Sequence, residues 1–176
     1  MAEVRQREGL EGWELQLRPG ARALTEVLSV VERVEDSKHL TDLVYIAQTC
    51  GLIEPVYLFT SLGPEPMAPV SGELEYDLVL LEAKGQIAHS ARASIVLTSP
   101  PRPSMIIDNY SYVKSAEALQ TLATFDPAQL AAMAKVAMLR EIWIQDEIVL
   151  EKAARSLFMS EPRTTEFMSY LNECSA

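Results

Sequence analysis

The stretch that follows Pro127 contains neither glycine nor proline before Pro162, and it constrains the fold more than any other part of the chain. Its apolar residues form two adjacent stripes at helical spacing, so the pattern predicts one long helix over 127–159. Asp126 followed by Pro127 is a typical helix start, because the aspartate can accept from an early backbone N–H. At 1.5 Å per residue this helix is about 50 Å long. Since that exceeds the diameter of a domain of this size, the helix either bends or is partly covered by another chain.

The predicted long helix also carries side chains that are typical of interface cores. Met138, Ile142 and Trp143 lie on its apolar stripes, and aromatic and methionine side chains are enriched where proteins bind each other. Asp146 and Glu147 follow and interrupt the apolar stripe with charge. These five residues are therefore a candidate partner-binding surface. Burial in the protein's own core is the alternative for Met138 and Trp143, and a solvated surface is the alternative for the two acids.

Two further helices are predicted in the first third of the chain. Apolar residues recur at helical spacing over 21–34 and again over 38–50. Ser37 is placed to cap the second of these helices, and Gly51 follows it where a left-handed residue commonly ends a helix. The whole chain of 176 residues fits one domain. Within it we expect 1–12 to be a flexible lead-in and 160–176 to form a short terminal helix.

The residues from 72 to 99 alternate between apolar and polar side chains, which predicts a β-hairpin with its turn at 84–85. In this register Asp77 faces Arg92 on the outer side, and opposite charges that face each other across two strands are favourable. Packing of this hairpin against the helices predicts an α+β fold with a small, mainly antiparallel sheet.

Positive charge is missing from the centre of the chain, because positions 39–83 contain neither lysine nor arginine. The net charge of the chain is −10. A negative surface repels nucleic acid and anionic membrane and favours a basic protein or a cationic ligand. Glu73, Glu75 and Asp77 would share one face of the predicted strand as a second candidate partner-binding surface, with a plain solvated face as the alternative. The acids of this stretch are Asp42, Glu54, Glu65, Glu73, Glu75, Asp77 and Glu82.

Motifs that specify a reaction are absent from the sequence. It has no metal-binding cysteine or histidine spacing, no glycine-rich phosphate loop and no nucleophile elbow, so we predict neither a metal nor a cofactor. His39 and Cys50 share one predicted helix about 16 Å apart along its axis, too far for a catalytic dyad. The alternative to a binding protein is a small enzyme or ligand-binding domain. Its pocket would lie between sheet and helices, with carboxylates and His89, Tyr76 or Tyr110.

Taken together, these features favour a non-catalytic protein of protein–protein interactions, such as an adaptor, an inhibitor or immunity protein, or a chaperone-like subunit. We expect a basic protein as its partner, or a homo-oligomer formed through the long helix, and no direct contact with nucleic acid or membrane. The first residues mix charges, and no apolar run reaches the length of a membrane span. The two cysteines, Cys50 and Cys174, suggest no disulfide framework, so a cytoplasmic location is expected.

Overall fold

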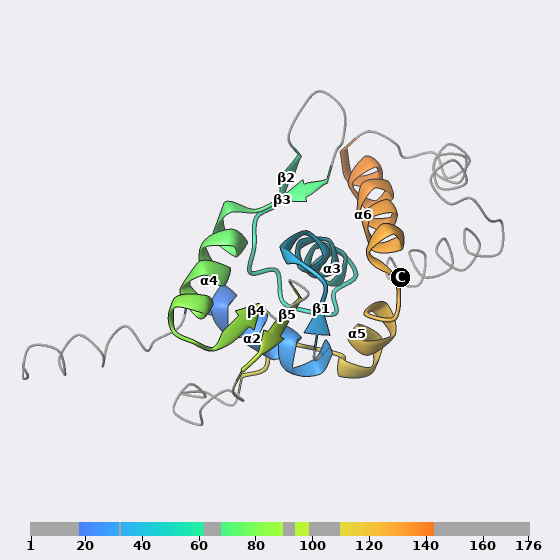
Figure 1. The fold of residues 1–176 in the computed structure, drawn as a ribbon. Coiled ribbons are helices and arrows are strands. Elements are labelled where there is room, and N and C mark those ends of the chain that lie inside the picture. Colours follow the sequence, from blue (N-terminus) through green and yellow to red (C-terminus); the bar gives the residue numbers. More distant parts are fainter. Residues whose placement is uncertain (1–17, 32, 62–67, 90–93, 99–109, 143–176) are drawn as a thin grey trace, which may run out of the picture.

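The described helices surround a central one, α3, which spans Ser37–Thr49 (Figure 1). The computed structural model describes residues 18–31, 33–61, 68–89, 94–98 and 110–142, with the backbone alone at 33, 89 and 140–142. Figure 1 shows α4 on one side of α3 and α6 on the other. In chain order the described elements are α2 (Pro19–Val31), β1 (Arg33–Val34), α3, β2 (Thr60–Ser61), β3 (Pro69–Val70), α4 (Gly72–Ala83), β4 (Ile87–His89), β5 (Ile95–Leu97), α5 (Ala116–Leu122) and α6 (Pro127–Ile142).

The core forms where the apolar stripes of these helices meet. The helix predicted over 21–34 is confirmed as α2 as far as Val31, whereas 33–34 form the strand β1 instead. Helix α2 buries Leu24 and Leu28. The predicted helix over 38–50 is confirmed as α3, which buries Leu40 and Leu43. Burial of one such leucine contributes roughly 1.5–3 kcal/mol, so these stripes account for much of the packing energy. The later helices add Leu74, Leu81, Leu119, Leu122, Leu130, Met133 and Val136 to the same core.

Local side chains determine where α3 begins and ends. The predicted cap was one residue off, because the Asp36 carboxylate, and not the Ser37 hydroxyl, accepts from the backbone N–H of His39 at 2.7 Å. A carboxylate is favoured there because it also meets the positive end of the helix dipole. The predicted left-handed residue after the helix is confirmed, since Gly51 has a φ of 66°.

The predicted start of the C-terminal helix is confirmed by a reciprocal cap. Asp126 Oδ1 accepts from the backbone N–H of Gln129 at 2.8 Å, and Gln129 Oε1 accepts from the backbone N–H of Asp126 at 3.0 Å. This is a capping box. The structure describes α6 as far as Ile142, which is 16 residues. The predicted continuation to 159 and the predicted helix over 160–176 lie outside the described residues.

Three short strands form an antiparallel sheet in the order β1-β5-β4. Ile87 of β4 pairs with Leu97 of β5, and Val34 of β1 pairs with Ile95 of β5. A separate two-stranded antiparallel sheet joins β2 to β3. With the five helices of the described ranges, these small sheets give an α+β fold, as predicted.

The predicted hairpin over 72–99 is wrong in its first half, because 72–83 forms the helix α4. Ser71 Oγ accepts from the backbone N–H of Leu74 at 3.4 Å and caps the helix, and two glutamates in its first turn complement the helix dipole. Leu74, Leu78 and Leu81 have helical spacing, and all three are buried. The cap and the three buried leucines therefore favour a helix, although the same residues also alternate between apolar and polar side chains.

The second strand of the predicted hairpin, over 86–99, is also wrong, because its described residues form two short strands that pair with each other and not with 72–83. Gly85, which was assigned to the turn, instead ends α4 with a φ of 65°, as glycines commonly do after a helix. Its N–H donates to the carbonyl of Glu82 at 2.8 Å. Strands β4 and β5 then pair antiparallel with each other, with Ile87 opposite Leu97 and His89 opposite Ile95.

Candidate docking surface on helix α4

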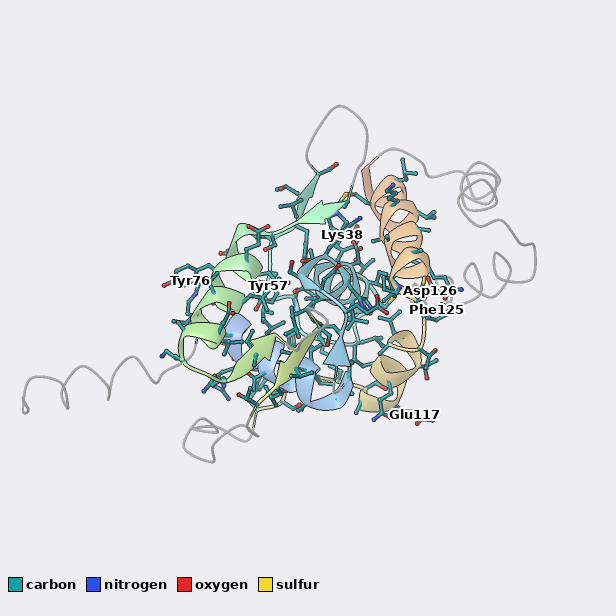
Figure 2. All side chains as sticks on the ribbon, viewed as in Figure 1. Lys38, Tyr57, Tyr76, Glu117, Phe125 and Asp126 are labelled. Atoms are coloured by element: carbon teal, nitrogen blue, oxygen red, sulfur yellow. The ribbon has the colours of Figure 1, made fainter. Side chains whose placement is uncertain are left out.

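Helix α4 carries apolar side chains on two opposite sides. Leu74, Leu78 and Leu81 face the core. Tyr76 and Val79 face outward and are 56% and 65% exposed, and Figure 2 shows Tyr76 on the side of α4 that points away from α3. A surface helix of a globular protein usually has a polar outer side. Neighbouring apolar side chains on that outer side are more typical of a surface that another molecule covers.

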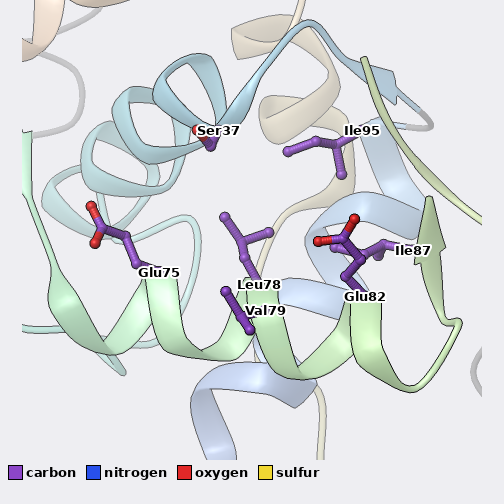
Figure 3. A pocket seen from close by; sticks show the side chains of 7 residues that line it. All are labelled: Ser37, Glu75, Leu78, Val79, Glu82, Ile87 and Ile95. Carbon is purple, nitrogen blue, oxygen red and sulfur yellow. The ribbon is translucent and has the colours of Figure 1, made fainter. Parts of the chain in front are cut away.

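A hollow of about 220 Å³ lies beside α4, between the start of α3 and the three-stranded sheet (Figure 3). Its surface is mostly apolar, with Leu78 and Val79 from α4 and Ile87 and Ile95 from the two strands. Ser37, the first residue of α3, contributes a hydroxyl at the opposite wall. The hollow therefore offers an apolar side chain a place out of water.

Two carboxylates flank this hollow. Glu75 and Glu82 both line it, and Figure 3 shows them at its opposite ends. They stand seven positions apart on α4, which is about 10.5 Å along a helix axis. Neither lysine nor arginine is among the seven described residues that line the hollow. The arrangement therefore suits an apolar group that carries positive charge on one or both sides.

The other flank of α4 holds a second group of polar residues, which we name the Arg18 corner and define as Arg18, Glu73, Tyr76 and Asp77. The guanidinium of Arg18 lies 5.5 Å from the centre of the Tyr76 ring, close enough for a cation–π contact. Its nitrogens lie 3.7 Å from Glu73 Oε1 and 4.0 Å from Asp77 Oδ1. One cation thus faces a ring and two carboxylates at once.

Asp77 is fully buried, so the prediction that it shares a solvated face with Glu73 and Glu75 is wrong. A helix turns position 77 inward with the leucines, whereas the predicted strand would have turned it outward. Asp77 Oδ2 accepts from the hydroxyl of Tyr57 at 3.2 Å, while Oδ1 has no hydrogen-bond partner among the described residues. Burial raises the pKa of the Asp77 carboxyl, although Arg18 and the Tyr57 hydrogen bond act in the opposite direction.

Tyr57 and Gly20 explain how a carboxylate fits into this buried position. Burial and the nearby Asp77 carboxylate raise the pKa of Tyr57 far above its usual range, so its hydroxyl remains a hydrogen-bond donor. Gly20, in the first turn of α2, leaves room for both side chains. A Cβ at this position would lie 2.5 Å from Asp77 Oδ2 and 2.7 Å from Tyr57 Cε1. Glycine is therefore required by this close approach.

Of the predicted partner-binding residues of the C-terminal helix, the structure describes the side chain of Met138 alone. Met138 lies in the core of the described structure and is buried, so the alternative that we kept for it holds. Ile142 is the last residue of α6 as described. Trp143, Asp146 and Glu147 lie outside the described residues. Of the two candidate surfaces, only the one that includes Glu73 and Glu75 can be described in atomic detail.

Two residues of the alternative active site, Tyr76 and Tyr110, lie away from the hollow. Tyr76 lies in the Arg18 corner, and Tyr110 packs edge-on against Tyr112, with the ring centres 5.1 Å apart. Neither is among the residues that line the hollow, and the side chain of His89 lies outside the described part. His39 stands in the first turn of α3 and Cys50 follows its last residue, which agrees with the prediction that they form no dyad.

The sequence interpretation missed a buried polar pair on α3. Asp42 is 1% exposed, and its Oδ1 has no hydrogen-bond partner among the described residues. Burial raises the pKa of Asp42 to about 6, while Lys38 and Lys135 oppose this shift. One turn earlier, burial lowers the pKa of His39, whose Nδ1 accepts from the backbone N–H of Glu35 at 3.1 Å. The available signal was the position of both groups among the leucines of the helix.

Comparison of the chain with protein-family models, with curated proteins and with solved structures finds no match in any of the three. Within the described ranges, no three histidine, cysteine, aspartate or glutamate side chains gather in a way that could hold a metal ion. The helices that the structure describes do not include one with the length and apolar character needed to cross a membrane. Function is therefore inferred from the surface of α4.

Proposed function

We propose that this chain is a non-catalytic binding protein whose helix α4 docks a basic segment of a protein partner. The observation that carries the proposal is the apolar hollow beside α4 with Glu75 and Glu82 at its two ends. The exposed side chains of Tyr76 and Val79 extend the apolar surface along the same helix. A partner that inserts one apolar side chain and places lysine or arginine on both sides of it would match the apolar lining and the negative charge of this surface.

The size of the hollow favours one side chain of a protein over a whole small molecule. Pockets for small molecules and cofactors usually enclose about 300–1,000 Å³, whereas this hollow encloses about 220 Å³. Protein interfaces, in contrast, often place one anchoring side chain in a small pocket and surround it with weaker contacts. The hollow therefore suits an anchor residue of a protein partner.

The order in which the described elements are connected shows which kind of ligand the charge of α4 favours. The described elements follow the order of a winged helix, with α2, β1, α3 and α4 before the β4–β5 pair and with the strand order β1-β5-β4. The small β2–β3 sheet is inserted between α3 and α4. In helix-turn-helix proteins the second helix of the pair lies in the major groove of DNA. Here the corresponding helix, α4, exposes Glu73, Glu75 and Glu82, and phosphates repel such a surface. The helix that would contact DNA in such a protein is therefore better suited here to bind a basic protein.

A second copy of the chain is a poorer occupant of this surface than a basic partner. A symmetric dimer through α4 would bring the glutamates of one copy against those of the other, and like charges across an interface are unfavourable. Homo-oligomers formed through the predicted long C-terminal helix are a separate proposal that this surface does not address. A cytoplasmic location of the complex stays a prediction.

A second candidate function is the binding of a small organic cation, such as an aliphatic diamine. It is favoured by one observation, namely that the hollow lies between sheet and helices and has a carboxylate at each end, as the alternative prediction required. The small volume of the hollow makes it the weaker candidate. Competition between a diamine and a basic peptide for the protein would show which ligand the hollow prefers.

Binding of defined peptides tests the proposed function. The probe is a fluorescein-labelled peptide with one leucine between arginines, measured by fluorescence anisotropy. Two control peptides replace the arginines with glutamates or the leucine with serine. We expect the first peptide alone to bind saturably, because the other two lose either the charge complementarity or the apolar anchor.

Charge reversal on the protein locates the binding. Glu75→Lys should weaken the binding of the basic peptide about 5- to 30-fold, because an attraction is replaced by a repulsion. The matched control is Glu117→Lys, which makes the same charge change on the exposed first turn of α5, away from α4 (Figure 2). Equal weakening by both variants, or equal binding of the glutamate peptide, would refute the proposal.

A further inference from the structure

Arg18 occupies a cradle on α4 that could hold a cation more closely than it holds the guanidinium of Arg18. The cradle consists of the ring of Tyr76, the carboxylate of Glu73 and the buried carboxylate of Asp77. Arg18 reaches it from the residue just before α2, and its side chain is half-exposed. The cradle thus belongs to α4, whereas the cation that fills it comes from another element.

The buried oxygen of Asp77 is the part of this cradle that calls for a closer cation. Asp77 is 0% exposed, and its Oδ1 has no hydrogen-bond partner among the described residues. The nearest nitrogen of Arg18 lies 4.0 Å from it, beyond the usual length of a charge-assisted hydrogen bond, which is about 2.7–2.9 Å. A buried acceptor that lacks a donor is unfavourable. A guanidinium that moved closer would supply that donor.

The ion pairs of Arg18 with Glu73 and Asp77 are weak. Its distance of 3.7 Å from Glu73 is also longer than a hydrogen bond, and ion pairs between half-exposed side chains contribute little because water competes with them. The described part of the chain begins at Arg18 and continues into α2 from Pro19. Displacement of the Arg18 side chain would therefore break neither a hydrogen bond to Glu73 nor one to Asp77.

We infer that the cradle of Glu73, Tyr76 and Asp77 is a guanidinium-binding site, which the side chain of Arg18 covers until an arginine of the partner replaces it. A guanidinium fits better than an ammonium, because a planar group can stack on Tyr76 while its N–H groups reach two carboxylates. The identity of the ligand as a partner's arginine rests on the proposed function. The existence of a guanidinium-binding site does not depend on the proposed function.

The first test removes the internal cation and offers a small one. In Arg18→Ala, ethylguanidinium should shift the carboxyl ¹³C resonance of Asp77 saturably, with half-saturation on the order of 10 mM for contacts of this kind. The wild-type protein should need at least about fivefold more, because Arg18 competes for the same groups. Ethylammonium should bind more weakly than ethylguanidinium. If Arg18→Ala does not fold, Arg18→Gln keeps the length of the side chain and permits the same titration.

A matched control separates this site from any arginine beside a tyrosine. Arg22 lies over the ring of Tyr112 at 5.3 Å, and Arg22→Ala causes the same change in net charge. It should leave the response of Asp77 to ethylguanidinium as in the wild type. The inference is overturned if ethylguanidinium gives no saturable shift in Arg18→Ala, or if wild type, Arg18→Ala and Arg22→Ala respond alike.

The labelled peptides then connect the site to the partner. Arg18→Ala should bind the arginine peptide about 3- to 10-fold more tightly than Arg22→Ala does, because the internal competitor is gone. For a version of the peptide with lysines in place of the arginines, the gain in affinity from Arg18→Ala should be smaller. If ethylguanidinium binds and the peptide does not, the proposed function fails while the site stands. If the peptide binds and ethylguanidinium does not, the site fails while the proposed function stands.

Discussion

Substitution of Asp42 by asparagine should stabilise the protein at neutral pH. Asp42 is 1% exposed in the centre of α3, and its Oδ1 lacks a hydrogen-bond partner among the described residues. Burial of the charged form raises its pKa from 3.8 to about 6. A difference of about two pH units corresponds to roughly 3 kcal/mol, at about 1.4 kcal/mol per unit. The ionised carboxylate therefore lowers the free energy of unfolding by up to that amount above pH 6.

The sign of the pH dependence follows from proton binding. Because the folded state has the higher pKa, it binds the Asp42 proton more tightly than the unfolded state does. The contribution of this group is thus most favourable below about pH 4, and it is lost as the pH rises through about 6. The amide of the Asp42→Asn variant lacks the charge at every pH. We expect this variant to gain about 1–2 kcal/mol at pH 7.5, less than the full amount because the new amide N–H groups also need partners.

Urea unfolding followed by far-ultraviolet circular dichroism measures this effect. The difference in free energy between Asp42→Asn and wild type should be positive at pH 7.5 and should shrink to zero or change sign at pH 4. Comparison at each pH cancels the titration of all other groups. The exposed variant Glu117→Gln serves as the control, with little change at either pH. A destabilisation by Asp42→Asn that is equal at both pH values would refute the reasoning.

Three further predictions concern the packing around Asp77. Gly20→Ala should lower the free energy of unfolding by about 1–3 kcal/mol, because its Cβ would overlap Asp77 and Tyr57. The control Gly72→Ala, which meets no described atom within 4 Å, should be neutral or stabilising in the same urea titration. Tyr57→Phe should cost about 1–3 kcal/mol because a buried carboxylate oxygen loses its donor, and unchanged stability would show that water replaces the hydroxyl. Gln48→Ala should raise hydrogen exchange at the backbone N–H of Tyr57, which donates to Gln48 Oε1 at 3.0 Å.

The helices that could be predicted from the sequence are those whose signals are local. The apolar spacing of α2 and α3 lies within single segments, and the cap at Asp126 lies next to the helix that it starts. Such patterns need no knowledge of the rest of the fold. Even there the cap of α3 was placed at Ser37, because serine and the preceding Asp36 are both suitable caps.

Helix α4 could not be predicted because one buried position carries a charge. Asp77 stands where the helical pattern calls for an apolar residue, and the polar side chain made the segment resemble an alternating strand. What permits its burial comes from distant positions, namely Tyr57, Arg18 and the space left by Gly20. These contacts exist only after folding, so a single segment does not reveal them.

The hollow likewise depends on contacts between distant segments. Its walls come from Ser37, from α4 and from Ile95, which are far apart in the chain. The sequence indicated the acidic character of the surface but not its position, because a strand and a helix turn different residues outward. Glu75 and Glu82 lie on one side of the helix only because they are seven positions apart.

The most direct test of docking on α4 is to map the bound peptide by NMR. In ¹⁵N-labelled protein, the leucine-and-arginine peptide should shift the backbone resonances around the hollow, above all those of Glu75, Val79, Glu82, Ile87 and Ile95. Resonances of α5 should remain in place. Shifts that cluster on α5 or α6, or that spread evenly over all acidic residues, would contradict the assignment of α4 as the docking helix.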